Sequence, residues 1–276
     1  MKAVRSVAPA VLLVLFLTTS VFLSTAQAGD WTAKGRFERS LQVTGPVSLK
    51  VETGSGNISV RHGSGNSVHV VGEIRARGTN AEEKVRRLEA EPPIEQTGNT
   101  IHIGKIEEEA LRRKVSISYQ IEVPADTRVD AGTGSGDVIG ESILGPVNAA
   151  TGSGNVSLSN IEHEVTATTG SGDVVISGAS SGVKATTGSG NIRGTNLKGG
   201  AVLQTGSGDV SVEQSALGDV RVGTGSGNVH VTGVKGRLTA ETGSGDVLLE
   251  GAPEGSWRLS AGSGDLRLKL PAGTGY

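Results

Sequence analysis

The chain lacks cysteine and has few aromatic residues. Its 276 residues include no Cys, two Trp, two Tyr and three Phe. Without cysteine, the chain has no disulfide framework, no thiolate metal site and no lipid anchor of the lipoprotein type. Between Arg128 and Gly275 the only aromatic residue is Trp257. This stretch therefore offers no row of rings on which a polysaccharide-cleaving enzyme could hold its substrate.

A charge excess of either sign is also missing. Lys and Arg number 26, against 28 Asp and Glu, and the formal net charge is −2. Removal of residues 1–28, which contain Lys2 and Arg5, leaves 24 basic against 28 acidic residues. A weakly acidic chain is not attracted to nucleic acid or to anionic lipid. We therefore expect no nucleic-acid partner.

The one long apolar run stands at the N-terminus. Lys2 and Arg5 precede an apolar stretch over residues 10–17, and Ala26–Ala28 forms a typical cleavage site. This arrangement predicts a secretory signal peptide over residues 1–28. The stretch is too short and too interrupted by Thr and Ser for a membrane span. We expect a secreted protein of the periplasm or cell surface, with no integral membrane segment after cleavage.

Glycine is abundant, and it recurs at a fixed spacing. From residue 133 onward, a corner of the form Thr-Gly-Ser-Gly-Asp or Thr-Gly-Ser-Gly-Asn appears eight times, at steps of 18 or 19 residues. The copies begin at Thr133, Thr151, Thr169, Thr187, Thr205, Thr224 and Thr242, with Ala261 replacing Thr in the last. Such a period is typical of a solenoid, in which each unit buries its apolar side only by stacking on its neighbour.

Each repeat predicts two short strands. In the unit of residues 169–186, Val174 and Ile176 share one face, and after a glycine-rich corner Val183 and Ala185 do the same. This period of two is that of a strand, and the chain's 43 glycines disfavour helix. We therefore predict an all-β fold, a parallel β-helix or β-solenoid with coils of about 18 residues.

One position of the corner alternates between acid and amide. Down the stack it reads Asp137, Asn155, Asp173, Asn191, Asp209, Asn228, Asp246 and Asp265. Carboxylates about 5 Å apart in adjacent coils would repel each other by about 1–3.5 kcal/mol. An Asn in every second coil separates the charges and can donate its amide to them. We predict a polar ladder, broken only at Asp246 and Asp265, where fraying of the end would relieve the repulsion.

The threonine and serine of each corner, such as Thr169 and Ser171, stand two residues apart. On a strand they would face the same way and form two files of hydroxyl groups. The seven repeat threonines and the acid–amide ladder together make the candidate binding surface. Threonine files of this kind resemble the ice-binding faces of some secreted β-solenoids, although small hydroxyl residues also satisfy backbone groups in turns.

The first part of the mature chain lacks the regular period. We assign residues 29–127 to a β-rich N-terminal cap and residues 128–276 to the solenoid, because a stack needs a covered end to avoid edge-to-edge pairing. The cap contains two early copies of the corner, at residues 53–57 and 62–66. The pattern predicts no comparable cap at the C-terminal end, so either a few residues hide that edge or the sequence is shorter than the natural unit; an exposed terminal coil would allow end-to-end self-association.

Local patterns inside the cap predict one short helix and one hairpin. The helix is expected from Ala81 to about Ala90, with Asn80 and Glu83 as a capping box. The hairpin is expected to join residues 94–96 to residues 101–103.

The order of these features resembles a known bacterial family. A signal peptide, a mixed segment ending in a strand at Val123-Pro124 and then repeated Thr-Gly-Ser-Gly-Asp/Asn units are similar to secreted β-strand-repeat proteins of unknown function, usually labelled "putative adhesins". The resemblance covers about residues 40–276. It implies a β-helical, non-enzymatic protein of the surface or periplasm.

Three other functions compete with adhesion. The corner is similar to the calcium repeats of secreted toxins, but every second acid is Asn, and calcium prefers several carboxylates together. A polysaccharide-active β-helix would need paired carboxylates, and the acids outside the ladder are dispersed. The third alternative is binding of ice or another crystal surface by the threonine files.

One short motif also needs mention. Gly178–Gly182 matches a nucleophile elbow, but that motif requires a following helix.

The favoured hypothesis is a non-catalytic exported adhesin or cell-envelope scaffold that binds through an extended polar repeat surface. Its partner would be a surface, a glycan or an envelope protein. We expect no cofactor and no metal, because the five histidines show no metal-ligand spacing.

Overall fold

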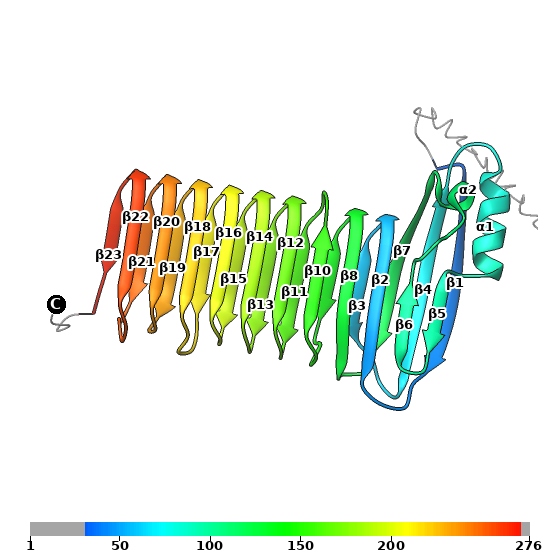
Figure 1. Cartoon of the computed structure of the whole chain (residues 1–276), viewed down its shortest axis with the longest axis horizontal. Coiled ribbons are helices and arrows are strands. Elements are labelled where there is room, and N and C mark those ends of the chain that lie inside the picture. The colour runs from blue at the N-terminus through cyan, green and yellow to red at the C-terminus, as the bar shows by residue number, and fades with distance from the viewer. Residues whose placement is uncertain (1–30, 272–276) are drawn as a thin grey trace, which may run out of the picture. The chain divides into compact units, whose positions relative to one another are not determined.

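Two sheets, each with its strands mostly parallel, run side by side along the chain (Figure 1), and one column of buried apolar side chains lies between them. The computed structural model describes residues 31–271, so the predicted signal peptide lies outside the described residues. Within that range the chain is all-β, a parallel β-solenoid of about eight turns with coils of about 18 residues and two short helices. The predicted fold class is confirmed.

The larger sheet, called sheet A here, has twelve strands among the described residues. In spatial order they are β1 (Ala33–Gln42), β4 (Ser67–Ala76), β7 (Val115–Val123), β3 (Ile58–His62), β9 (Val138–Glu141), β11 (Val156–Ile161), β13 (Val174–Ala179), β15 (Ile192–Leu197), β17 (Val210–Gln214), β19 (Val229–Val234), β21 (Val247–Gly251) and β23 (Leu266–Lys269).

The opposite sheet, sheet B, has eleven strands in the same part of the chain. In spatial order they are β22 (Trp257–Ser263), β20 (Leu238–Ser244), β18 (Val220–Ser226), β16 (Ala201–Ser207), β14 (Val183–Ser189), β12 (Val165–Ser171), β10 (Val147–Thr151), β8 (Thr127–Ser135), β2 (Val47–Ser55), β6 (Thr100–Ile103) and β5 (Ile94–Thr97).

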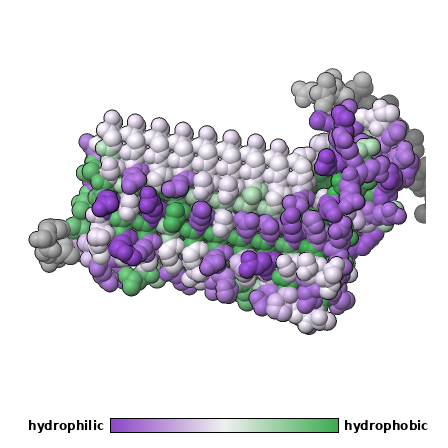
Figure 2. All heavy atoms as spheres, in the orientation of Figure 1, coloured by the Kyte–Doolittle hydropathy of each residue, from purple (hydrophilic) through white to green (hydrophobic). Residues whose placement is uncertain are grey.

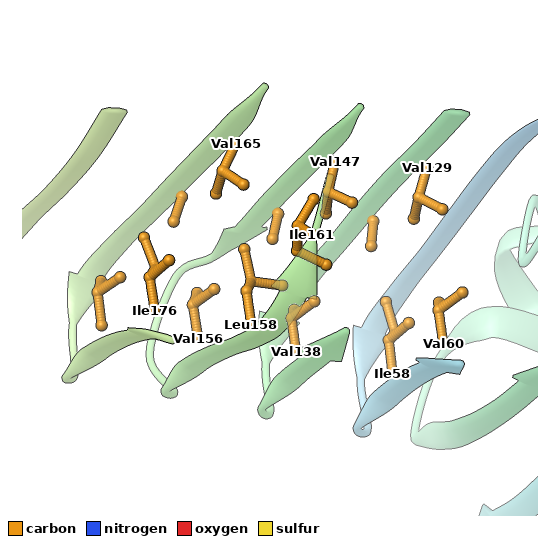
Figure 3. Close-up of a cluster of buried hydrophobic side chains, with 14 of the residues drawn as sticks. Ile58, Val60, Val129, Val138, Val147, Val156, Leu158, Ile161, Val165 and Ile176 are labelled. Carbon is orange, nitrogen blue, oxygen red and sulfur yellow. The ribbon is translucent and has the colours of Figure 1, made fainter. Parts of the chain in front are cut away.

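Equivalent residues of successive coils lie side by side, as the period predicts. Val174 pairs with Ile192, and Ile192 pairs in turn with Val210. Figure 3 shows the result inside the stack, where valines of sheet B point toward valines and isoleucines of sheet A. Val174, Ile176 and their apolar equivalents are almost completely buried, except Leu266 and Leu268 on β23. The core is therefore a column to which each coil adds one layer.

Two glycine files make the tight corner possible. A Cβ added to Gly170 would lie 2.6 Å from the carbonyl oxygen of Gly152, and one added to Gly172 would lie 1.9 Å from that of Gly154. Both separations are far inside van der Waals contact, so no side chain fits. The corner motif contains two glycines because the backbones of stacked coils touch at both positions.

The N-terminal end of the stack is covered by elements that break the parallel pattern. In sheet A, β4 pairs antiparallel with both β1 and β7, and in sheet B the β5–β6 hairpin adds to β2. Helix α1 (Ala81–Ala90) buries Ala81, Val85 and Leu88 and packs on β1 and β4. The predicted helix and hairpin are both confirmed.

Some local expectations for the cap are wrong. Asn80 has a left-handed backbone (φ 62°) and makes no side-chain capping bond, so there is no capping box. A second helix, α2 (Glu109–Arg112), is present where only one was expected. Residues 62–66 are not a coil corner, because they connect β3 to the antiparallel strand β4.

The other early corner, at residues 53–57, belongs to a true coil. Strand β2 pairs in parallel with β8, and Thr53 lies opposite Thr133. Strand β3 pairs in parallel with β9. The division between residues 127 and 128 stays a prediction, but stacking in the solenoid register already begins at β2.

Candidate ligand-binding surface

The acid–amide positions form one continuous hydrogen-bonded ladder on the outer side of sheet A. In each step the backbone N–H of one rung donates to the side-chain Oδ1 of the rung before it. The N···O distances run from 2.7 to 3.0 Å, as in Asn155 to Asp137 (2.9 Å) and Asn228 to Asp209 (2.7 Å). The rungs are Asn57, Asp137, Asn155, Asp173, Asn191, Asp209, Asn228, Asp246 and Asp265.

The register of the ladder is as expected, but its chemistry differs. The Asn side chains accept backbone N–H groups and do not donate their amides to the carboxylates. At the C-terminal end, a cation lies beside the adjacent acids Asp246 and Asp265, and the relief of their repulsion by fraying stays a prediction. The Arg267 guanidinium donates to Asp265 at 3.2 Å.

The seven repeat threonines stack in register as one file, but they do not lie on the surface, so their expected place on a binding surface is wrong. Thr133, Thr151, Thr169, Thr187, Thr205, Thr224 and Thr242 are 2–7% exposed. Each donates its Oγ1–H to a glycine carbonyl of the preceding coil at 2.8–2.9 Å, as Thr169 does to Gly154. A buried carbonyl without a partner is costly, and the threonine satisfies it.

Of the two hydroxyl files of the corner, only the serine file reaches solvent. Ser171, Ser189 and their equivalents are exposed. Figure 2 shows this edge as an even row of weakly polar residues along the ends of β10 to β22. Without the threonines, the corner does not present the paired hydroxyl files on which the ice-binding alternative rested.

Beside the ladder, the middle coils enclose a shallow hollow of about 290 Å³. Three rungs, Asp173, Asn191 and Asp209, line one side of it. The next outward position of each strand supplies Val175, Arg193 and Ser211. Val175 is 39% exposed, so the hollow combines carboxylates, an amide, a guanidinium and a small apolar patch.

These flanking residues were not among the sequence candidates, although a signal for them existed. They stand two places after a rung, and the period of two puts both positions on one face. The rung and its neighbour therefore form a two-residue strip that repeats in every coil.

A larger hollow of about 510 Å³ lies on the outer face of the cap strands. It carries residues of both charge signs, and Arg61 there is paired with Glu122. Tyr119 in the same strands faces the core, where burial raises the pKa of its hydroxyl. Its oxygen has no hydrogen-bond partner within the described residues. The cap hollow is thus a mixed-charge surface, in contrast to the regular ladder.

Exposed ion pairs tie neighbouring coils together. The Arg237 guanidinium donates to Asp219 at 2.7 Å and holds the pKa of that carboxyl below its ordinary value. Lys269 does the same for Glu250, at 2.6 Å. In the cap, the Lys50 ammonium and then the His102 ring lower the pKa of Glu52. Each shift has a local ion pair as its cause, so none marks a catalytic acid.

The described residues give no support to the competing activities. Residues 31–271 contain no group of three or more His, Cys, Asp or Glu arranged to hold a metal ion. The elbow-like segment Gly178–Gly182 joins strand β13 to strand β14, with no helix after the turn. In the same range, no helix has the length and apolar character that a membrane crossing requires.

Comparison with known proteins gives a family and a fold. A family model described as Toastrack DUF4097 matches residues 49–276. The chain is similar to a crystal structure from Parabacteroides distasonis described as a "putative lipid binding protein", with 15% identity and a TM-score of 0.51 over 85% of this chain and 97% of that one. A second structure from that organism, described as a "putative adhesin", has 15% identity and a TM-score of 0.51 over 84% and 97%. At this identity the likeness shows the fold alone. None of the curated proteins matches the chain.

Proposed function

Because this chain belongs to the Toastrack DUF4097 family, whose model matches residues 49–276, we propose that it is a non-catalytic, exported binding module of the adhesin type. It attaches through the outer face of sheet A to a glycan or an envelope protein. A structural neighbour described as a "putative adhesin" is consistent with such a role.

The observation that supports this most is the free half of each rung. Within the described chain, only the Oδ1 atoms of Asp173, Asn191 and Asp209 are engaged by the ladder. All three residues are exposed, so the second carboxylate oxygens and the Asn amide nitrogen offer alternating acceptors and donors to a ligand. Sugar hydroxyls both donate and accept hydrogen bonds, so a hydroxyl-rich polymer matches this alternation.

The geometry favours a long ligand over a small one. Adjacent coils are about 4.8 Å apart, and a polymer lying along the stack would meet the same pair of positions in every coil. Arg193 and Val175 add a cation and an apolar patch in the middle of this strip. Binding would come from many weak contacts, and deletion of coils should weaken it progressively.

The structure supplies variants that test the strip without disturbing the fold. Asn already occupies alternate rungs, so Asp173→Asn with Asp209→Asn keeps both Oδ1 acceptors and removes only the charges. After a glycan and matrix array has identified a ligand, titration should show binding by this double variant about 10-fold weaker, from the loss of two charge-assisted hydrogen bonds. Its melting temperature should match that of the parent chain.

The control is Lys184→Gln, on the outer face of sheet B. It removes a charge from the opposite side of the stack and should leave affinity unchanged. If no glycan or envelope protein binds saturably, or if the double variant binds like the parent, the proposed surface is wrong.

Export is tested separately. Fractionation of cells that express the full chain should recover it from the periplasm or the cell surface. Retention in the cytoplasm would contradict export without affecting the binding proposal.

A further inference from the structure

The strip of rungs and flanking residues on sheet A repeats every second coil, not every coil. We propose that its ligand is a glycan in which every second sugar is an N-acetylhexosamine and the sugars between them carry a carboxylate. This inference rests on the proposed function, because it concerns the same strip and names the class of glycan that the strip binds.

The flanking residues form a single row across sheet A, because they pair in register from strand β3 to strand β23. In spatial order the row reads Ser59, Ile139, Ser157, Val175, Arg193, Ser211, His230, Leu248 and Arg267. Each of these residues stands two places after the rung of its own coil.

The kind of flanking residue follows the kind of rung. Aliphatic residues follow three of the five Asp rungs, and a polar residue follows each of the four Asn rungs. The three aliphatic coils are those of Asp137, Asp173 and Asp246. The exceptions are Asp209, which is followed by serine, and Asp265, which is followed by arginine. An acid beside an aliphatic group thus alternates with an amide beside a polar group in most coils.

This alternation gives the surface a repeat of two coils, or about 9.6 Å. In an extended glycan with equatorial linkages, one pyranose ring is about as long as the spacing between coils, and successive rings turn opposite faces to a surface. A disaccharide is therefore the unit that matches two coils. A β-strand peptide advances about 3.3 Å per residue, so its side chains on one face recur about every 6.6 Å and do not keep step with the coils. The repeat favours a glycan over an extended peptide.

The Asp coils with an aliphatic neighbour fit an acetamido group. The aliphatic side chain stands about 7 Å from the carboxylate residue along the strand, and Ile139 and Val175 are 42% and 39% exposed. In the described part of the chain, the ladder occupies only Oδ1 of Asp137 and of Asp173. An acetamido group can donate its N–H to the other carboxylate oxygen while its methyl group covers the aliphatic side chain. A hydroxyl group makes only the first of these contacts.

The Asn coils fit an acidic sugar. Their rung is an uncharged amide, and in the middle of the strip its neighbour is Arg193, which is exposed and makes no ion pair within residues 31–271. A guanidinium can hold a carboxylate through two hydrogen bonds, and the amide of Asn191 can donate beside it. Two coils further along, His230 stands at the same position and offers a ring N–H. Carboxylates on alternate sugars therefore meet these two residues and not the Asp rungs.

Isothermal titration of the full chain with four defined hexasaccharides tests the glycan class. Hyaluronan alternates N-acetylglucosamine with glucuronic acid, so it should bind most tightly. Its carboxyl-reduced form should bind about 10-fold more weakly, because the charge-assisted contact with Arg193 is lost. A chitin hexasaccharide, which has acetamido groups and no acid, should resemble the reduced form. A cellulose hexasaccharide has neither group and should bind most weakly.

A charge-neutral exchange tests the register of the strip. Val175 and Arg193 lie side by side on adjacent strands, so the double variant Val175→Arg/Arg193→Val keeps the composition and moves the cation to an Asp coil. It should bind the hyaluronan hexasaccharide about 10-fold more weakly and melt at the temperature of the parent chain, since both positions are exposed. The matched control is Val202→Arg/Arg221→Val, the same exchange on adjacent strands of sheet B, which should leave affinity unchanged.

Three results would each overturn the inference: no binding of the hyaluronan hexasaccharide, equal binding of the hyaluronan and cellulose hexasaccharides, or a sheet A exchange that binds like the parent. The proposed function is judged separately by Asp173→Asn with Asp209→Asn. A ligand that loses affinity in that double variant but is insensitive to the Val175 and Arg193 exchange would support the binding surface and refute only the alternation of sugars.

Discussion

The two ends of the stack treat the same kind of side chain in opposite ways. At the N-terminal end, Phe37 on β1 is 3% exposed and lies edge-to-face with Tyr119 at a centroid distance of 6.3 Å. On β23, the last strand among the described residues, Leu266 and Leu268 keep the core-facing position of their column but are 50% and 47% exposed. Burial in this fold is thus provided by the adjacent layer, as expected of a quasi-one-dimensional stack.

The largest expected effect comes from opening the capped end. Phe37→Ala removes the ring that fills the space above Gly72, where a Cβ would lie 2.2 Å from the ring. Loss of a buried phenylalanine costs about 3–5 kcal/mol. Urea unfolding should therefore show a fall of this size in the free energy of unfolding. Glu38→Ala, the exposed neighbour on the same strand, is the control, and an equal loss there would contradict the role of the ring.

A matched pair of leucines compares an inner layer with the open end directly. Leu249 and Leu268 occupy the same position in adjacent coils but are 0% and 47% exposed. Leu249→Ala should lower the free energy of unfolding by about 2–5 kcal/mol. Leu268→Ala should lower it by less than about 1 kcal/mol, because about half of the side chain is already in water. The comparison is made at low protein concentration, and similar losses would refute the unequal burial.

A smaller effect is expected from the corner hydroxyl. Thr187→Val keeps the volume of the side chain but leaves the carbonyl oxygen of Gly172 without its 2.9 Å hydrogen bond. An unsatisfied buried acceptor costs about 1–3 kcal/mol. Ser189→Ala in the same corner should be nearly neutral, because that hydroxyl is exposed. If the serine change proves the more damaging, the inward placement of threonine is wrong.

The smallest effect concerns the ion pair that joins β23 to β21. A hydrogen bond from Lys269 lowers the pKa of Glu250 from its ordinary value of 4.5. A carboxyl with a lowered folded pKa stabilises the fold above the unfolded pKa, and this contribution disappears as pH falls through the folded pKa. Lys269→Gln should therefore lower the melting temperature slightly at pH 7. The difference from the parent should shrink as pH falls below about 4.5, and a difference that grows in acid would contradict the pair.

Much of the fold was predictable because the corner repeats at a nearly constant step. Two glycines that cannot carry a Cβ fix where each coil turns, so the spacing alone predicts which residues stack. The register of Val174, Ile192 and Val210 follows directly. Helix α1 and the β5–β6 hairpin were predictable from local pattern, whereas α2 is a single turn without an apolar period and carries no such signal.

The candidate surface was predictable only in part. Counting forward from the corner puts Thr169 and Ser171 on one face, but the alternation of buried and exposed residues stops at Gly170, so Thr169 is buried and Ser171 is exposed. Counting from the preceding strand instead places Thr169 in line with the buried Val165 and Ala167, and its inward position follows. Residue types alone could not show which groups donate in the ladder, because an Asn side chain can accept through its oxygen or donate through its amide. The position of the neighbouring backbone N–H decides that the oxygen is used.

Every hydrogen bond of the acid–amide ladder runs in the same direction, and this limits how the number of coils can change. Each coil brings one N–H and one Oδ1 to the rungs on either side, so whole windings can be gained or lost without leaving any rung unmatched. Insertion or loss of a single winding, however, would place two acids or two amides in adjacent rungs. Insertion or loss of two windings keeps the alternation of acid and amide. Duplication of two coils would therefore lengthen this surface while keeping the alternation of acid and amide.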